Sequence, residues 1–159
     1  MALIPIDDPD DPRIAAYRDI RERDLVGRAG LFVAEGEVVL RVLVERAGHA
    51  TVSLLLADSR VEGLAPLLDR LDPAIPVHVV PRAVLDRIAG FPIHRGILAV
   101  GRRTPPPEPD DLLAGVAGPA AVAVLIGIAN HDNMGGIFRN AAAFGAAAVL
   151  LDATSCDPL

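Results

Sequence analysis

Residues 119–152 carry the pattern that most limits how the chain can fold. An apolar run of strand length, 119–128, is followed by a polar turn with two adjacent glycines, a short helical pattern and a second apolar run, 146–152. Strands that are buried on both faces lose the alternation of polar and apolar residues, so these runs predict one β-α-β unit of a parallel sheet. Open parallel sheets bind ligands beyond the carboxyl ends of their strands, so we expect any chemistry between Asn130 and Arg139.

The turn and helix between the two runs contain the candidate site. We predict that Asn133 is the helix N-cap and that Gly135–Gly136 lets backbone N–H groups approach a ligand closely. Arg139 lies outside the stripe of apolar side chains that we predict to be buried on this helix. Its guanidinium carries a permanent charge and five N–H donors, none of which is needed for packing. The plainer alternative is that Asn133 only caps the helix and Arg139 is only a solvated side chain. The stripe itself has i, i+4, i+7 spacing: Ile137, Ala141 and Phe144.

This segment resembles a known family. The stretch Asn133-Met-Gly-Gly-Ile-Phe-Arg139-Asn-Ala141, followed by Phe144-Gly145 and an apolar strand, resembles the first conserved motif of the SpoU/TrmH-type RNA ribose methyltransferases of the SPOUT superfamily. The resemblance implies catalytic roles for both polar residues. Arg139 would help to activate the ribose 2′-hydroxyl or hold its phosphate, and Asn133 would order the catalytic loop. The chain departs from the family at residues 130–132, Asn-His-Asp, where an Asp-Pro lead-in is common.

Composition excludes several classes of protein. A hydrophobic content of 52% excludes a disordered chain, and a single cysteine, Cys156, excludes a disulfide framework. The four histidines show no metal-ligand spacing, so no metal is expected. The longest apolar run, 119–129, is far shorter than the ~20 residues of a membrane span, and we expect a cytoplasmic protein. With a net charge of −6, RNA binding would have to depend on a local basic patch.

Residues 13–103 alternate between helical and strand patterns, which predicts a second α/β sandwich. Residues 1–12 are acidic and proline-rich, and we predict a flexible leader there. The predicted elements are a helix from Arg13, a strand at 31–34, a helix from Glu37, a strand at 51–57, a helix at 61–71, a strand at 76–80, a helix at 82–89 and a strand at 96–101. In the helix from Glu37, the side chains predicted to face inward are Val38, Val39, Val42 and Leu43.

Two stretches of this part also resemble the family. Phe32-Val-Ala-Glu35-Gly36 and Pro92-Ile-His94-Arg95-Gly96-Ile-Leu-Ala99 are similar to landmarks of its N-terminal substrate-binding domain, although the family usually has Gln in place of Arg95. The resemblance implies the fold of an RNA-binding ribosomal protein. Four candidates have a structural alternative: Glu35 as a helix-start carboxylate, His94 as a hydrogen-bonded structural residue, and Arg21 and Arg23 as part of a solvated helix face. The candidate RNA-binding residues are Glu35, His94, Arg95, Arg21 and Arg23.

A proline-rich segment, 104–118, reads as a stiff linker between the two parts. Beyond it, a two-stranded unit at 119–159 is too small to cover both faces of its sheet, so we expect a domain that is incomplete at its C-terminus. The resemblance implies that this is the N-terminal part of a methyltransferase domain. The resemblance implies that later motifs form a trefoil knot, which builds the S-adenosylmethionine pocket and much of a homodimer interface. We therefore expect no cofactor-binding residue in this chain and no activity from it alone.

Three functions remain open from the sequence. The leading one is transfer of a methyl group from S-adenosylmethionine to a ribose 2′-hydroxyl of ribosomal or transfer RNA. The second is a non-catalytic RNA-binding α/β module. The third is a nucleotide- or phosphate-binding Rossmann-like enzyme that uses the turn at 133–136, but the chain has neither a Gly-x-Gly-x-x-Gly nor a Gly-Lys-Ser/Thr pattern.

Overall fold

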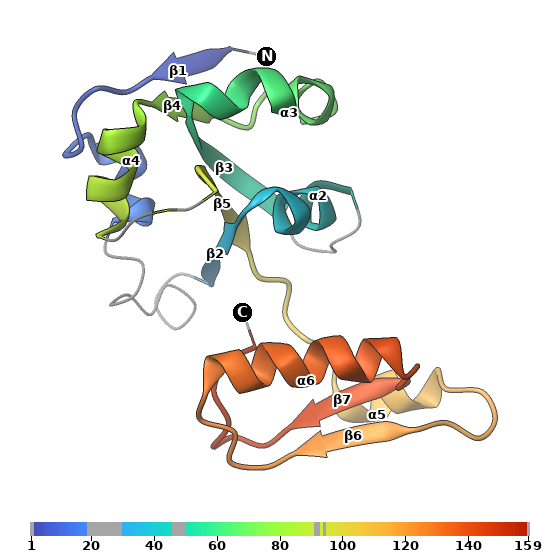
Figure 1. Ribbon diagram of the computed structural model, residues 1–159. Coiled ribbons are helices and arrows are strands. Elements are labelled where there is room, and N and C mark those ends of the chain that lie inside the picture. The colour runs from blue at the N-terminus through green and yellow to red at the C-terminus, as the bar shows by residue number, and fades with distance from the viewer. Residues whose placement is uncertain (1, 19–29, 46–49, 91–92, 94, 159) are drawn as a thin grey trace. The chain divides into compact units, whose positions relative to one another are not determined.

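The computed structural model describes residues 2–18, 30–45, 50–90, 93 and 95–158. The chain divides into two compact units, Met1–Thr104 and Pro105–Leu159, which are called unit 1 and unit 2 below (Figure 1).

Unit 1 contains a mixed five-stranded sheet in the order β1-β4-β3-β5-β2. β1 and β3 both run parallel to β4, whereas β5 is antiparallel to β3 and to β2. The strands are β1 Leu3–Pro5, β2 Leu31–Glu35, β3 Ala50–Ala57, β4 Val77–Val80 and β5 Ile97–Arg102.

The central strand β3 is buried on both faces, and its side chains alternate between two apolar clusters. Leu54 and Leu56 belong to the cluster that includes the leucines of α2 and α3, while Leu55 and Ala57 belong to the cluster beneath η1 and α4. Unit 1 is therefore a three-layer α/β sandwich, as the alternation of elements predicted. The helices are η1 Pro12–Tyr17, α2 Glu37–Glu45, η2 Asp58–Arg60, α3 Val61–Leu68 and α4 Arg82–Ala89.

A buried polar contact joins η1 to β3. The hydroxyl groups of Tyr17 and Ser53 lie 2.7 Å apart, and either one could donate. Burial raises the pKa of Tyr17 above its ordinary value, because the charged phenolate would lose its hydration. Tyr17 is thus neutral and satisfied in the core, which suits an aromatic side chain with one polar end.

The inward face of α2 differs from the prediction. Leu40 and Leu43 are buried, whereas Val38 and Val42 are 69% and 49% exposed and Val39 is also exposed. Only Leu43 was placed correctly. Leucines at i and i+3 remove more apolar area from water than valines would, and this preference decides which side of the helix meets the sheet.

The prediction of a flexible leader at residues 1–12 was wrong. β1 forms the edge of the sheet beside β4, and the backbone N–H of Ile6 donates to the carbonyl of Val79 at 2.9 Å. Ile6 is buried, because it follows β1 directly and enters the cluster beneath η1 and α4. The short apolar stretch that begins at Leu3 outweighs the acidic residues after it.

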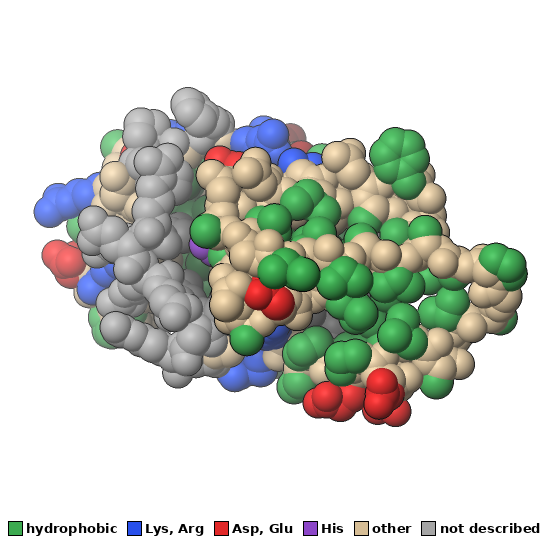
Figure 2. Space-filling view, turned by 90° about the horizontal axis from the view of Figure 1, so that it is seen from below, with side chains coloured by type: hydrophobic (Ala, Val, Ile, Leu, Met, Phe, Trp, Pro, Cys, Tyr) green, Lys and Arg blue, Asp and Glu red, His purple; other side chains and the backbone are tan. Residues whose placement is uncertain are grey.

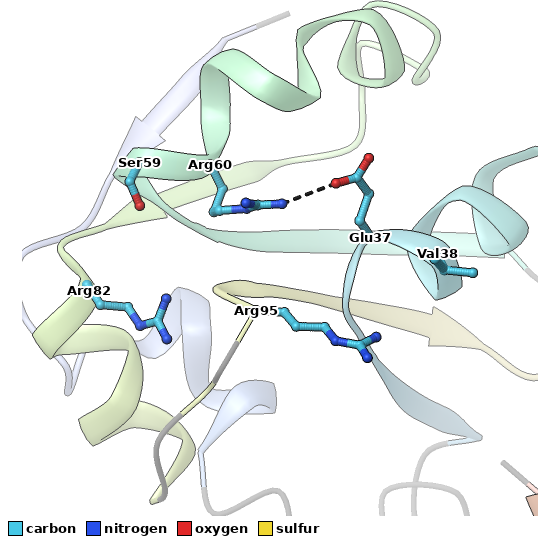
Figure 3. A pocket seen from close by; sticks show the side chains of 6 residues that line it. All are labelled: Glu37, Val38, Ser59, Arg60, Arg82 and Arg95. Carbon is cyan, nitrogen blue, oxygen red and sulfur yellow. Dashed lines mark hydrogen bonds and ion pairs between the residues drawn. The ribbon is translucent and has the colours of Figure 1, made fainter.

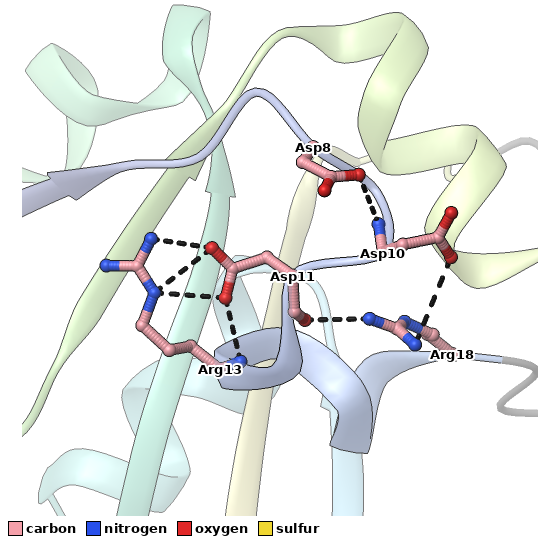
Figure 4. A network of polar contacts seen from close by, with 5 residues as sticks. All are labelled: Asp8, Asp10, Asp11, Arg13 and Arg18. Atoms are coloured by element: carbon pink, nitrogen blue, oxygen red, sulfur yellow. Dashed lines mark hydrogen bonds and ion pairs between the residues drawn. The ribbon is translucent and has the colours of Figure 1, made fainter.

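The acidic residues after β1 are held by two arginines (Figure 4). Asp11 caps η1 by accepting from the backbone N–H of Arg13 at 2.8 Å, and it pairs with the guanidinium of Arg13 at 2.6 Å. Arg18 donates to the carbonyl of Asp11 at 2.7 Å, and its other terminal nitrogen lies 4.0 Å from Asp10. These contacts offset the repulsion between neighbouring carboxylates.

Unit 2 contains the predicted β-α-β arrangement. β6 and β7 are parallel, with Val122 opposite Ala148, and α6 connects them. A further short helix, α5, lies in the segment that the sequence predicted to be a linker. The elements are α5 Pro109–Ala114, β6 Val122–Leu125, α6 His131–Ala143 and β7 Ala148–Leu151.

One face of the β6–β7 pair is open. Along β6, Ala123 and Leu125 are half-buried, while Val122 and Val124 are exposed, and Ile126 just beyond the strand is 74% exposed. Figure 2 shows hydrophobic side chains gathered over this pair, on the face that α6 does not cover. Within the chain itself, therefore, these strands are not buried on both faces.

Two features are absent from the described residues. No helix among them has the length and apolar character that crossing a membrane requires. No group of three or more His, Cys, Asp or Glu side chains in the described part of the chain could hold a metal ion.

His78 lies in β4, between β1 and β3, and is almost completely buried. Its Nδ1 atom has no hydrogen-bond partner among the described residues. Burial lowers the pKa of His78 and nearby Arg13 lowers it further, while Asp11 acts in the opposite direction. The imidazole is therefore held in its neutral form in the folded protein.

We expect His78 to make unit 1 less stable at mildly acidic pH. Below a pH of about 6.5 the unfolded chain binds a proton at this histidine and the folded chain resists it, so the free energy of unfolding falls as pH drops toward the folded pKa. His78→Gln should remove this fall, measured as the melting temperature between pH 7.5 and 5. His131→Gln, at an exposed position, is the control. Equal slopes for wild type and His78→Gln would contradict the expectation.

Candidate functional site

The helix that carries the family-like motif begins earlier than predicted. Asn130 has an extended backbone, and its Oδ1 accepts from the backbone N–H of Asn133 at 2.9 Å, so Asn130 is the N-cap. The prediction that Asn133 caps the helix was wrong. Asn133 instead occupies the third helical position, where its backbone N–H is satisfied and its side chain is exposed.

The glycine pair also lies elsewhere than predicted. Gly135 and Gly136 are inside α6, where an α-helix bonds each N–H to the carbonyl four residues earlier. The predicted cradle of free backbone N–H groups is therefore not formed. A methyl group on Gly135 would lie 3.5 Å from Nη1 of Arg139 and one on Gly136 would lie 4.0 Å from its Nη2, which are ordinary contact distances, so the guanidinium lies beside this pair without requiring glycine there.

Arg139 lies back along α6 over this glycine pair. Helical side chains lean toward the N-terminus and cover the preceding turn, so the guanidinium comes to rest above residues with no side chain to obstruct it. Arg139 is exposed, and it forms no ion pair with any carboxylate among the described residues. Its charge and donors remain available to a ligand.

The predicted buried stripe of α6 is only partly found. Ile137 and Ala141 are half-buried, but Phe144 is 88% exposed, and the buried side chain is that of Met134. Phe144 follows the last helical residue, where the chain turns away from the strand pair. The stripe is therefore displaced toward the start of the helix.

A polar network that was not predicted from the sequence joins the loops after β6 and β7. Asp152 accepts from the backbone N–H of Gly127 at 3.1 Å and from the hydroxyl of Ser155 at 2.6 Å. Ser155 in turn accepts from the N–H of Ile128 at 3.1 Å. Hydrogen bonds from Ser155, Thr154 and Gly127 lower the pKa of Asp152, so it stays ionised and fixes the segment that leads to Asn130.

A sequence pattern indicates the local part of this network. Asp152 follows an apolar strand and is followed by Thr154 and Ser155, at spacings where hydroxyl groups bond to a preceding carboxylate. The partner on the other loop, Gly127, is too distant in sequence for that signal to identify it.

In unit 1 the two family-like landmarks meet at one end of the sheet. The backbone N–H of Gly36 donates to the carbonyl of Ile97 at 3.0 Å, which brings the end of β2 to the start of β5. A methyl group on Gly36, whose φ is +90°, would lie 2.7 Å from Cδ of Arg95, so the arginine packs directly on this glycine. Glu35 and Arg95 are both exposed at this end.

The structure describes only some of the other candidate RNA-binding residues of unit 1. Glu35 lies in β2, and the acidic residue in the first turn of α2 is Glu37, so the alternative that Glu35 is a helix-start carboxylate was wrong. His94, Arg21 and Arg23 lie outside the described residues. Arg60 and Arg82, which the sequence analysis did not single out, lie close to Arg95 around a pocket at the same end of the sheet.

Comparison with known proteins agrees with these landmarks, although no protein-family model matches the chain. Over 158 residues the chain is 39% identical to proteins of Mycobacterium bovis and Mycobacterium tuberculosis that are named uncharacterized tRNA/rRNA methyltransferase, covering 96% of this chain and 52% of theirs. The resemblance to the SpoU-type RNA methyltransferases is confirmed. The chain spans about half the length of the curated relatives it matches.

Solved structures of SpoU-type and other RNA methyltransferases share the fold. An AdoMet-bound rRNA methyltransferase from Sinorhizobium meliloti has a TM-score of 0.73 at 19% identity, covering 98% of this chain and 57% of that one. The SpoU methyltransferase AviRb from Streptomyces viridochromogenes, in complex with the cofactor AdoMet, has a TM-score of 0.69 at 19% identity, covering 92% and 55%.

Mutations of the two asparagines at the start of α6 should differ in their effect on helix stability. Asn130→Ala removes the cap and should destabilise α6 by about 1 kcal/mol, whereas Asn133→Ala removes an exposed side chain and should change stability by less than about 0.5 kcal/mol. Hydrogen exchange of peptides that cover residues 126–144, followed by mass spectrometry, measures the difference locally. Equal acceleration of exchange in both variants would contradict the assignment of Asn130 as the cap.

Proposed function

We propose that this chain supplies the RNA-binding part and the arginine-bearing part of a SpoU-type RNA methyltransferase. The reaction is transfer of a methyl group from S-adenosylmethionine to a ribose 2′-hydroxyl of ribosomal or transfer RNA. The observation that carries the proposal is the guanidinium of Arg139, which forms no ion pair with any described carboxylate and lies beside two glycines on the helix that follows a parallel strand. The names of the relatives support the class of substrate.

Arg139 acts on the ribose hydroxyl in this proposal. A fixed positive charge next to the hydroxyl lowers its effective pKa and stabilises the alkoxide that develops as the proton leaves. Because guanidinium is always protonated, it cannot be the base that removes the proton, and its contribution is electrostatic. Asn133, which lies six residues or about one and two-thirds turns earlier on the same helix, is the positioning residue for the adjacent loop.

The described residues of unit 2 do not by themselves fit S-adenosylmethionine. A ligand of that size needs an enclosing pocket with apolar walls, and the apolar side chains of Val122, Val124 and Ile126 instead lie on an open face. We therefore propose that the cofactor site needs residues that correspond to the other half of the relatives' length. No step involving the cofactor is assigned to this chain.

Unit 1 is the RNA-binding part in this proposal. Glu35 and Arg95 lie where the two landmarks meet, and His94, Arg21 and Arg23 complete the proposed set. We assign residues 13–103 to the substrate-binding domain, 104–118 to the linker and 119–159 to the start of the methyltransferase domain. A homodimer is proposed for the complete catalytic domain, with a cytoplasmic location and no metal.

A second function remains in competition, that of an RNA-binding module without catalysis. The observation in its favour is that Arg60, Arg82 and Arg95 surround a pocket of unit 1. Tight RNA binding by this chain, with no methylation by any longer form, would favour the module. Methylation by a longer form would favour the enzyme.

Arg139→Ala is expected to lower methylation about a hundredfold or more, the usual cost of losing one charge-stabilising group. The assay uses a protein that joins this chain to the second half found in the relatives, and follows transfer of labelled methyl groups to RNA. RNA affinity should change less than twofold. Asn140→Ala, the exposed neighbour on the same helix, is the control. If Arg139→Ala weakens RNA binding as much as methylation, Arg139 is a binding residue.

The chain alone is expected not to bind S-adenosylmethionine tightly, because its apolar sheet face does not enclose a ligand. Isothermal titration of the cofactor into the 159-residue chain should give no saturable heat at micromolar concentrations. Saturable micromolar binding would contradict the proposal that the cofactor site needs the rest of the relatives' length.

A further inference from the structure

A pocket of about 640 Å³ opens at one end of the unit 1 sheet (Figure 3). It lies where β3 and β4 end, where β5 begins and where α2 starts. This is also the end at which the two family-like landmarks meet. The lining residues are Glu37, Val38, Ser59, Arg60, Arg82 and Arg95.

Three arginines from three different segments converge on this pocket. Arg60 ends η2 after β3, Arg82 begins α4 after β4, and Arg95 stands two residues before β5. Gly96, with a φ of +66°, makes room for two of them, because a methyl group there would lie 3.1 Å from Nη1 of Arg82 and 3.2 Å from Cγ of Arg60. Gly36 does the same for Arg95. Close packing against these two glycines therefore holds the three side chains at the edge of the pocket.

The three guanidinium groups keep unused donors. Arg60 donates from Nη2 to Glu37 at 3.1 Å, but its Nε is buried without a partner among the described residues. Arg82 pairs through Nε with Asp86 at 3.6 Å and donates from Nη2 to the carbonyl of Ile93. Arg95 forms no ion pair with any described carboxylate. One buried donor without a partner is costly and the other unused donors line the pocket, so this pocket favours an acceptor with several oxygens.

The lining is suited to a phosphate group and not to a base. Three arginines face one carboxylate, so the lining carries a local charge of +2 in a chain whose net charge is −6. Guanidinium forks match the oxygens of phosphate in geometry as well as charge. No aromatic side chain is among the described lining residues, so the pocket offers no surface on which a base could stack.

Glu37 occupies the pocket as an internal anion. Its Oε2 accepts from Arg60 at 3.1 Å, and its Oε1 accepts from Arg41 at 2.9 Å. The side chains of all three residues are substantially exposed, and ion pairs of this kind are worth only about 0–1 kcal/mol each. A phosphate that meets several donors at once can therefore replace Glu37 at Arg60, while Arg41 retains the carboxylate.

We infer that Arg60, Arg82 and Arg95 bind a backbone phosphate of the RNA strand, and that Glu37 is the resident carboxylate which this phosphate displaces. The identity of the ligand as RNA rests on the proposed function; the phosphate site itself rests on the pocket. Phosphate contacts hold an RNA strand in register without reading its sequence. The site therefore positions the substrate of the methyltransferase and does not select it.

The first test measures RNA binding by the 159-residue chain. Fluorescence anisotropy with single-stranded RNA of several sequences, at several KCl concentrations, compares wild type with Arg60→Ala/Arg95→Ala. The double variant should bind about tenfold or more weakly on every sequence. The slope of log affinity against log salt should become shallower by about 0.7 for each phosphate that the variant no longer neutralises. An unchanged affinity and slope would overturn the phosphate site.

Two further variants separate the pocket from general charge and from misfolding. Arg70→Ala removes an arginine that pairs with Glu45, at the opposite end of α2 from Glu37 and about 12 Å away along the helix, so it should leave the affinity unchanged within about twofold. Arg60→Lys/Arg95→Lys keeps the charge and loses the fork, so its affinity should lie between those of wild type and the alanine variant. Circular dichroism melts verify folding. Equal losses of affinity in Arg70→Ala and the double alanine variant would overturn the site.

Replacing Glu37 should change the RNA affinity in the opposite direction to replacing the arginines. Glu37→Gln removes the carboxylate that competes with phosphate, so RNA affinity should increase about twofold to fivefold, in the range expected for losing one exposed charge pair. A merely structural role would predict equal or weaker binding. Either of those results would overturn the displacement of Glu37.

A competition experiment distinguishes RNA from small phosphate compounds as the ligand of the pocket. Inorganic phosphate and adenosine monophosphate should displace labelled RNA only at millimolar concentrations, because each offers the pocket one phosphate without the contacts of the remaining strand. Displacement at micromolar concentrations would assign the pocket to a small phosphate ligand and overturn its assignment to RNA. None of these measurements uses methyl transfer, so the phosphate site and the proposed catalytic role of Arg139 can fail independently.

Discussion

The burial of β3 on both faces holds unit 1 together and places its functional end. Each fully buried leucine of this strand is worth about 2 kcal/mol, several times the worth of an exposed ion pair. Leu54, Leu55 and Leu56 are all fully buried, so the position of the strand is fixed by packing and not by charge. The loops at its carboxyl end are then fixed as well. This leaves the ion pairs of Glu37 at that end free to exchange without disturbing the core.

Much of the element order could be predicted from the sequence, because apolar periodicity and turn residues are local signals. The helix at 82–89 was predicted to the residue, and the strands at 51–57 and 76–80 were predicted to within one residue. The same signals failed for α2, where apolar residues cover most of the helix surface and periodicity alone did not select the face. They failed again at β1, because an edge strand of three residues is too short to show a period.

The candidate sites, too, could be predicted from the sequence only in part. The exposure of Arg139 could be predicted from its spacing along the helix. The position of its guanidinium beside the glycine pair could not, because it depends on the residue at which the helix starts, and Asn130 sets that start. The convergence of Arg60, Arg82 and Arg95 depends on pairing between strands that are far apart in sequence. A single sequence carries no direct record of such pairing, so only the landmark containing Arg95 was found.

The buried pair of Tyr17 and Ser53 has a practical consequence for spectroscopy. The chain contains one tyrosine and no tryptophan, so its intrinsic ultraviolet emission comes essentially from this single ring in unit 1. Far-ultraviolet circular dichroism, in contrast, sums the helices of both units. Recording the two signals during one denaturant titration separates the unfolding of unit 1 from that of unit 2 without any added label, and shows whether the two units unfold as one cooperative body.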